Sequence, residues 1–201
     1  MILLYEKQTA IITLPKTGST SLFKTLCKRP YNGIFCIGPS GDDPNYYDHH
    51  SVILPQASFK WKVLVVVRNP LQRFVSLWGH LAKEMVMNMQ NPPSIKEFVD
   101  IIGDNTHCFY FYQWNQSKIL EKANYQYDII KTENMEEDLL EKNILTDRGE
   151  LLNVNVFNIT QRTRCYKELL DEDMIEKLKW WWQPDDLKFN YSISPVCDYD
   201  I

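Results

Sequence analysis

The first residues that can do chemistry lie between an apolar run and a helical pattern. Thr9–Leu14 is mostly apolar, Ser19–Leu26 is typical of a helix, and residues 15–18 (PKTG) connect them. A turn from a strand into a helix directs free backbone N–H groups and the positive end of the helix dipole at one point. The glycine lets a ligand approach the backbone closely, and the lysine adds a mobile positive charge. We therefore expect an anion-binding loop.

The candidate anion-binding residues combine a cation, backbone donors and hydroxyl groups; they are Lys16, Thr17, Gly18, Ser19, Thr20 and Ser21. The alternative interpretation is a plain strand-to-helix turn with a serine N-cap and a solvated lysine. The loop is not a Walker A motif, because its lysine precedes the glycine instead of following it. A hydrolase acting on a magnesium–nucleotide complex is thereby disfavoured.

A second anion-binding pattern occurs in residues 65–80 (VVVRNPLQRFVSLWGH). An apolar strand ends at Arg68, and an Asn-Pro pair then leads into a helix that carries Ser76. In a parallel sheet, Arg68 emerges at the same edge as the Lys16 loop, where ligands of open α/β folds bind. A guanidinium group binds phosphate through paired hydrogen bonds, and the Ser76 hydroxyl can reach the same phosphate if the connection bends back. The alternative is that Arg68 pairs with a nearby carboxylate.

Two anion sites at one sheet edge predict a ligand with two anionic ends. Residues 15–22 (PKTGSTSL) and 68–76 (RNPLQRFVS) resemble the paired signature of sulfotransferases that use 3′-phosphoadenosine 5′-phosphosulfate (PAPS). The resemblance is closest to the carbohydrate and heparan-sulfate 2-O branch. It extends to residues 130–133 (IKTE) and to 184–191 (PDDLKFNY), which is similar to a family ending of the type YxxDxxxFxY. It implies a P-loop-like strand–loop–helix and transfer of a sulfuryl group to a hydroxyl acceptor, with a carbohydrate expected.

The resemblance also implies a role for each matched residue. Lys16 and the backbone of Thr17–Ser21 hold the phosphosulfate, and Lys16 stabilises the bridging oxygen as its bond to sulfur breaks. Arg68 and Ser76 hold the 3′-phosphate. A sulfuryl group carries less charge than a phosphoryl group, so no metal ion is required.

The acceptor hydroxyl needs a general base that works near neutral pH. Residues 47–51 (YDHHS) precede the 3′-phosphate motif, and the catalytic histidine of the heparan-sulfate branch lies in a similar position. We favour His50 as the base, with His49 second and Asp48 able to orient either ring. The alternatives are that both histidines are surface residues or a weak metal site, and that Glu133 is the base.

One further nucleotide contact and two competing functions stay open. A later loop also contacts the nucleotide in this family, and Arg162 or Arg164 is a candidate for that contact. The alternative is that either arginine is a solvated surface charge. The competing functions are a nucleotide kinase or hydrolase with a variant phosphate loop, and a silent protein that binds the nucleotide without transfer.

The elements that position these residues alternate between strands and helices. Continuous β-branched runs are typical of parallel strands that are covered on both faces. We expect strands at Thr9–Leu14, Ile34–Ile37, Trp61–Val67 and Tyr127–Lys131, and helices at Ser19–Arg29, Pro70–Met89, Ser94–Ile102, Asn134–Lys142 and Asp171–Trp182. This alternation predicts one α/β domain over residues 1–201, a three-layer sandwich with a central parallel sheet.

Composition limits the partners and the compartment. A net charge of −4 argues against a binder of nucleic acids or membrane surfaces. The first strand begins too early for a signal peptide, and no apolar run approaches the roughly 20 residues of a membrane span. The five cysteines form no CxxC pair, so we expect buried thiols in a reducing compartment and a cytoplasmic protein. The expected partner is a small-molecule or carbohydrate acceptor, and the oligomeric state stays open.

Overall fold

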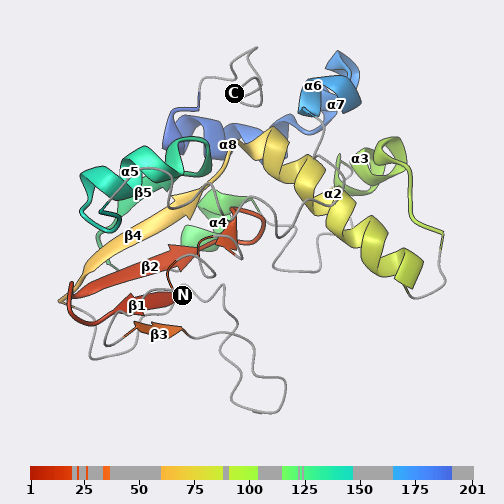
Figure 1. The fold of residues 1–201 in the computed structure, drawn as a ribbon. Helices are drawn as coiled ribbons and strands as arrows, with labels where there is room; N and C mark the ends of the chain where they lie inside the picture. Colours follow the sequence, from red (N-terminus) through yellow and green to blue (C-terminus); the bar gives the residue numbers. More distant parts are fainter. Residues whose placement is uncertain are drawn as a thin grey trace. The chain divides into compact units, whose positions relative to one another are not determined.

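The computed structural model describes two compact units. The first comprises Met1–Val67 and Leu120–Asn158, and the second comprises Arg68–Ile119 and Ile159–Ile201 (Figure 1). The described residues are 1–19, 22, 26, 34–36, 60–87, 91–103, 115–121, 123, 125–146 and 165–191; for 34–36, 83–87 and 103 the description covers the backbone alone. The expectation of a single domain stays a prediction.

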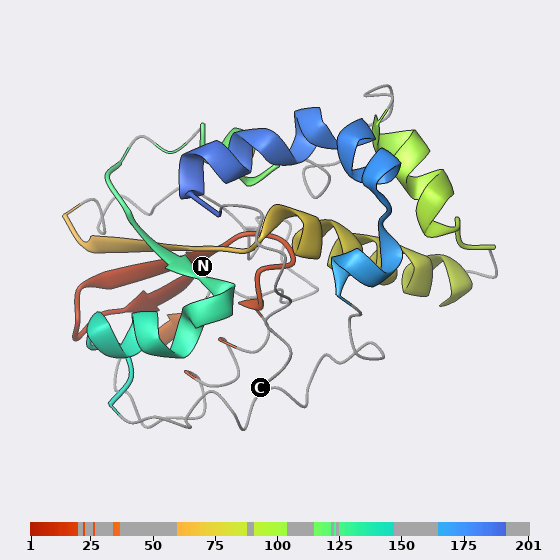
Figure 2. The same cartoon turned by 90° about the horizontal axis from the view of Figure 1, so that it is seen from above.

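The first unit holds a mixed β-sheet. Its described strands are β1 (Ile2–Leu4), β2 (Thr9–Thr13), β3 (Ile34–Cys36), β4 (Lys62–Val67) and β5 (Asp128–Lys131), in the order β3-β1-β2-β4-β5. Strands β2, β4 and β5 pair in parallel, whereas β1 pairs antiparallel with both β2 and β3 (Figure 2). The α/β class and the parallel pairing of the predicted strands β2, β4 and β5 are therefore confirmed, but the sheet is mixed and not the central parallel sheet that was expected.

The short link between β1 and β2 explains this difference. The amide of Lys7 donates to the carbonyl of Leu4, and the amide of Gln8 donates to that of Tyr5. Such a tight turn can join only antiparallel neighbours, because a parallel crossover needs a dozen or more residues. The parallel arrangement holds where the chain between the strands is long enough. The predicted three-layer arrangement stays a prediction.

One face of the sheet packs against helices of its own unit. Leu22 and Leu26, from the helix that begins at Ser19, lie in one buried cluster with Ile11 of β2 and Leu64 of β4. Helix α5 (Met135–Glu141) follows the short 3-10 helix η3 (Thr132–Asn134) and adds Met135 and Leu139 to that cluster. Val63–Val67 are all buried, as expected for a strand that is covered on both faces.

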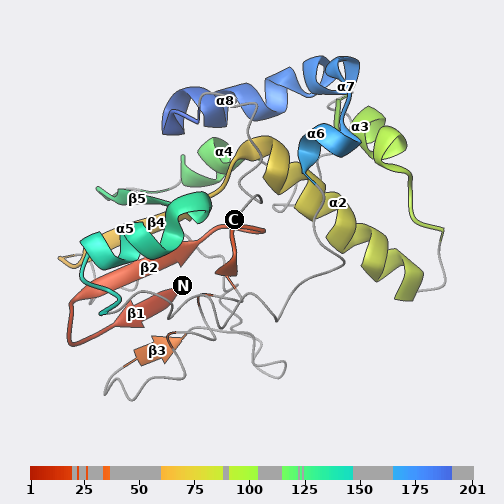
Figure 3. The same cartoon turned by 45° about the horizontal axis from the view of Figure 1, so that its top comes forward.

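The second unit is helical in its described part. Its helices are α2 (Pro70–Met87), α3 (Ile95–Gly103), α4 (Gln116–Leu120, whose last residue falls in the first unit), α6 (Tyr166–Leu169), α7 (Glu172–Lys177) and α8 (Lys179–Phe189). Helices α2, α3, α7 and α8 pack around a core that includes Phe74 and Trp181 (Figure 3). None of the helices in the described ranges is long and apolar enough to cross a membrane.

The predicted helix Asp171–Trp182 is instead two helices. Asp171 lies outside α7 as its N-cap and accepts a hydrogen bond from the amide of Met174 at 2.8 Å. The chain leaves helical geometry at Leu178 and re-enters it in α8, which continues through Pro184 to Phe189. Residues 171–182 contain no glycine or proline, so the sequence carries no strong local signal for the break at the buried Leu178.

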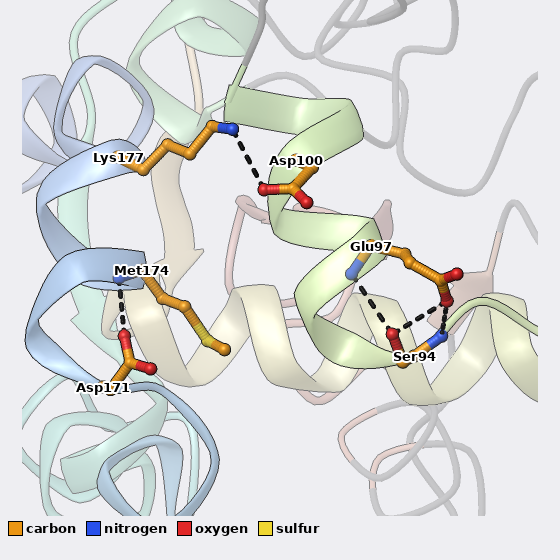
Figure 4. A network of polar contacts seen from close by, with 6 residues as sticks. All are labelled: Ser94, Glu97, Asp100, Asp171, Met174 and Lys177. Atoms are coloured by element: carbon orange, nitrogen blue, oxygen red, sulfur yellow. Dashed lines mark hydrogen bonds and ion pairs between the residues drawn. The ribbon is translucent and has the colours of Figure 1, made fainter.

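A capping box lies at the start of α3. The backbone amide and the hydroxyl of Ser94 donate to the carboxylate of Glu97 at 2.7 and 2.8 Å, and the amide of Glu97 donates back to the hydroxyl (Figure 4). These bonds lower the pKa of Glu97 because they stabilise its charged form. Lys177 of α7 forms an ion pair with Asp100 at 3.0 Å and so joins α7 to α3.

Cys165 differs from the expectation of buried free thiols. Cys165 is disulfide-bonded, and it is buried in the core of the second unit. The prediction of a free thiol is therefore wrong at this residue. Disulfides persist mainly in oxidising compartments, so this bond does not favour the predicted cytoplasmic location, which stays a prediction.

Candidate active site

The predicted anion loop begins with a tight turn at Leu14–Thr17. The amide and the hydroxyl of Thr17 both donate to the carbonyl of Leu14, at 3.3 and 2.8 Å. Pro15 occupies the second position of the turn, and Lys16 the third with φ +66°. These are the features of a type II turn, in which glycine is the usual third residue.

Lys16 therefore lies in a backbone conformation that disfavours any side chain. The left-handed region costs an L-residue about 1–2 kcal/mol relative to its ordinary conformations. Residues held in this way occur disproportionately at functional sites, where the surrounding structure imposes the conformation. The turn places a half-buried lysine where a glycine would fit with less strain.

Gly18 completes the loop and begins the helix. Its φ of +80° is a left-handed conformation, and a Cβ at this position would lie 3.3 Å from Cε of Met135 and 3.7 Å from Cγ2 of Thr132. The carbonyl of Gly18 accepts a hydrogen bond from the amide of Leu22 at 3.1 Å, so the helix starts at once. The first amides of a helix have no acceptor within it and are available to an anion.

Thr132 connects the loop to the neighbouring strand within the first unit. Its hydroxyl lies 2.8 Å from the carbonyl oxygen of Val67, at the end of β4, and 3.2 Å from that of Thr17. One hydroxyl proton serves both acceptors, so the two carbonyls are held close together. Thr132 lies in the matched motif at residues 130–133, but the sequence analysis assigns it no role. Its contacts are with backbone carbonyls far away in the chain, and such contacts produce no local sequence pattern.

The register of the sheet confirms that β2 and β4 end at the same edge. Thr13, the last residue of β2, pairs in parallel with Val66, the penultimate residue of β4. The carboxyl ends of neighbouring parallel strands are where ligands of open α/β sheets bind. The Lys16 loop follows one of these ends directly.

The predicted start of the second motif's helix is confirmed. The side-chain oxygen of Asn69 accepts from the amides of Leu71 and Gln72, each at 3.1 Å, and so caps α2. Pro70 is the first helical residue, where its lack of an N–H group has no cost. Arg68 immediately precedes this cap, and Ser76 lies half-buried further along α2.

Arg73, the other arginine of this motif, is a core residue. It is fully buried, and its guanidinium carbon lies 5.4 Å from the centre of the Trp181 ring. Burial lowers the pKa of Arg73 to about 10, with Asp185 acting to raise that pKa and Arg68 to lower it further. Arg73 thus stays protonated at neutral pH and packs inside the second unit.

Several predicted site residues lie outside the described residues, and their roles stay predictions. They are Thr20, Ser21, His49, His50, Arg162 and Arg164. Glu133, the alternative base, is half-buried in η3. The carboxylate alternative for Arg68 also stays open.

The described geometry defines an α/β protein with a strand–loop–helix at the carboxyl edge of its parallel strands. The model of the sulfotransferase family matches residues 6–192. The chain therefore belongs to the sulfotransferase family and is an enzyme of sulfuryl transfer. No curated protein and no solved structure matches it.

Proposed function

We propose that this enzyme transfers the sulfuryl group of PAPS to a hydroxyl of an acceptor, with a carbohydrate as the acceptor class. The observation that carries the proposal is the strained Lys16 in a turn between β2 and a helix, in a chain whose family transfers sulfuryl groups. The resemblance of the two motifs to the carbohydrate and heparan-sulfate 2-O branch supports the donor and the acceptor class.

The loop fits the 5′-phosphosulfate end of this donor. Gly18 takes the left-handed φ of +80° that turns the chain into the helix, and the first amides of a helix attract an anion. Lys16 and the backbone of Thr17–Ser21 are assigned to this end of the donor. Arg68 and Ser76 are assigned to its 3′-phosphate, and Arg162 or Arg164 to a further contact.

The donor supplies the sulfuryl group, and the protein supplies charge and a proton acceptor. Lys16 places a positive charge where negative charge develops on the leaving group, which lowers the barrier most when the charge is held in advance. His50 accepts the proton of the acceptor hydroxyl, with His49 as the second candidate and Glu133 as the third. The displacement is in line, because the attacking oxygen and the leaving oxygen lie on opposite sides of the sulfur.

A binding experiment separates this function from the nucleotide kinase or hydrolase. Isothermal titration should show that adenosine 3′,5′-bisphosphate binds more tightly than ATP with Mg²⁺, because Lys16 and Arg68 match two anionic ends and the loop lacks the GK[ST] of a Walker A motif. Single-turnover transfer from labelled PAPS to a panel of sugars then distinguishes an enzyme from a silent binder. Preference for ATP with Mg²⁺ would contradict the proposal.

The assignment of the base has its own test. His50→Ala should lower kcat by roughly 10²–10⁴-fold, since general base catalysis contributes about that much. It should also remove the rise of the rate with pH near neutrality, because a histidine accepts a proton only in its neutral form. His49→Ala is the matched control and should keep that rise. A His50→Ala enzyme with the wild-type pH profile would transfer the role to His49 or Glu133.

A further inference from the structure

The side chain of Gln116 holds the backbone of Arg68 on both sides. Arg68 lies between β4 and the cap of α2, outside both elements. Its amide donates to Oε1 of Gln116 at 2.8 Å, and its carbonyl accepts from Nε2 of Gln116 at 2.8 Å. A single planar amide therefore fixes the direction of both backbone groups of Arg68.

Asp185 in turn fixes the orientation of the Gln116 amide. Its Oδ2 accepts from Nε2 of Gln116 at 3.0 Å and from the backbone amide of Gln116 at 2.9 Å. A flipped amide would set its oxygen against the carboxylate of Asp185 and the carbonyl of Arg68, which are both acceptors. Only the observed orientation leaves Oε1 available to the amide of Arg68.

Gln116 and Asp185 are buried, and the polar atoms of both side chains are hydrogen-bonded. Gln116 and Asp185 both have 0% exposure. The second carboxylate oxygen of Asp185 accepts from the amide of Ser117 at 2.6 Å, so both oxygens are used. A buried carboxylate is tolerated only with such partners, and the buried Arg73 supplies a cation in the same unit.

We propose that Gln116 and Asp185 are positioning residues that set the direction in which the Arg68 side chain leaves the backbone, and so determine selectivity for the 3′-phosphate. The inference rests on the proposed function, because Arg68 is the residue assigned to that phosphate. Asp185 belongs to the matched ending at residues 184–191, and the proposal gives this carboxylate a role.

The test compares two nucleotides on one variant. Gln116→Met keeps the length of the side chain and removes both hydrogen bonds to Arg68. The ratio of the affinities for adenosine 3′,5′-bisphosphate and adenosine 5′-phosphate should fall by roughly tenfold, the effect of a weakened hydrogen bond to a charged group. Both affinities fall equally when part of the protein is unfolded, so that the ratio reports position and not stability. Asp185→Asn should lower the same ratio.

Gln72→Met is the matched control. Gln72 is also buried, and its Oε1 accepts from the amide of Tyr166 at 3.2 Å. This variant should lose stability and keep the wild-type ratio. A Gln116→Met protein that keeps the wild-type ratio overturns the inference while the proposed function stands. A wild-type protein without any preference for the 3′-phosphate overturns the proposed function, and the role of Gln116 with it.

Discussion

Replacing Lys16 by alanine should lower kcat for sulfuryl transfer by roughly 10²–10³-fold, the range for loss of one fixed donor to a developing negative charge. The turn that holds Lys16 is closed by bonds between Thr17 and Leu14, which do not involve the lysine side chain. The variant should therefore keep the loop. The loss should appear in kcat more than in KM, because the charge is needed most as the bond to sulfur breaks.

Lys16→Gly makes this prediction sharper, because the structure assigns opposite effects on stability and activity. The φ of +66° disfavours a side chain, and glycine adopts it freely. The gain of about 1–2 kcal/mol from relief of strain is partly offset by about 0.5–1 kcal/mol of extra entropy in the unfolded chain. The free energy of unfolding should therefore stay level or rise by up to about 1.5 kcal/mol, while turnover falls as in Lys16→Ala.

Chemical denaturation and steady-state transfer rates check both parts. Lys60→Ala is the control, since it removes a positive charge from an exposed lysine of the same unit. It should keep the wild-type kcat. Wild-type turnover in folded Lys16→Ala and Lys16→Gly would remove the lysine from the mechanism. A glycine variant less stable than the alanine variant would contradict the strain argument.

The sequence predicted the parts of the fold that have strong local signals. The β-branched run of β4 and the Asn-Pro start of α2 were each located within a residue, because burial and capping leave marks in the chain itself. Strand β1 was missed because Ile2–Leu4 is too short to show a period. Its hairpin with β2 follows from the turn at residues 5–8, which the run of polar residues there does not distinguish from a loop.

The residues of the candidate site also differ in whether they have a local sequence signal. Lys16 and Gly18 were predicted as site residues because a cation and a glycine between a strand and a helix form a recognisable local pattern. Thr132, Gln116 and Asp185 contact residues far away in the chain, so sequence analysis could assign them no role, although Thr132 and Asp185 lie in matched motifs. Sequence patterns thus predict candidate ligand-binding residues, while the residues proposed to position them can be recognised only from the fold.

Replacing Arg68 by alanine should remove selectivity for the 3′-phosphate with little effect on the fold. The hydrogen bonds that hold this residue to Gln116 use its backbone amide and carbonyl, and an alanine keeps both. Affinity for adenosine 3′,5′-bisphosphate should fall by roughly 10–100-fold, the value of hydrogen bonds to a charged group. Affinity for adenosine 5′-phosphate should stay near the wild-type value, because that ligand lacks the phosphate in question.

Isothermal titration of both nucleotides measures this selectivity in Arg68→Ala. Arg68→Lys and Lys62→Ala are measured for comparison. Lysine keeps the positive charge but lacks the planar guanidinium group. The affinity of Arg68→Lys for adenosine 3′,5′-bisphosphate should therefore lie between those of Arg68→Ala and the wild type. Lys62 is exposed at the opposite end of β4 from Arg68, and its loss should change neither affinity. Equal weakening for both nucleotides would mean that Arg68 does not distinguish the two ligands. Unchanged binding of both would favour the carboxylate pairing, because an arginine neutralised by an acid contributes nothing to a phosphate.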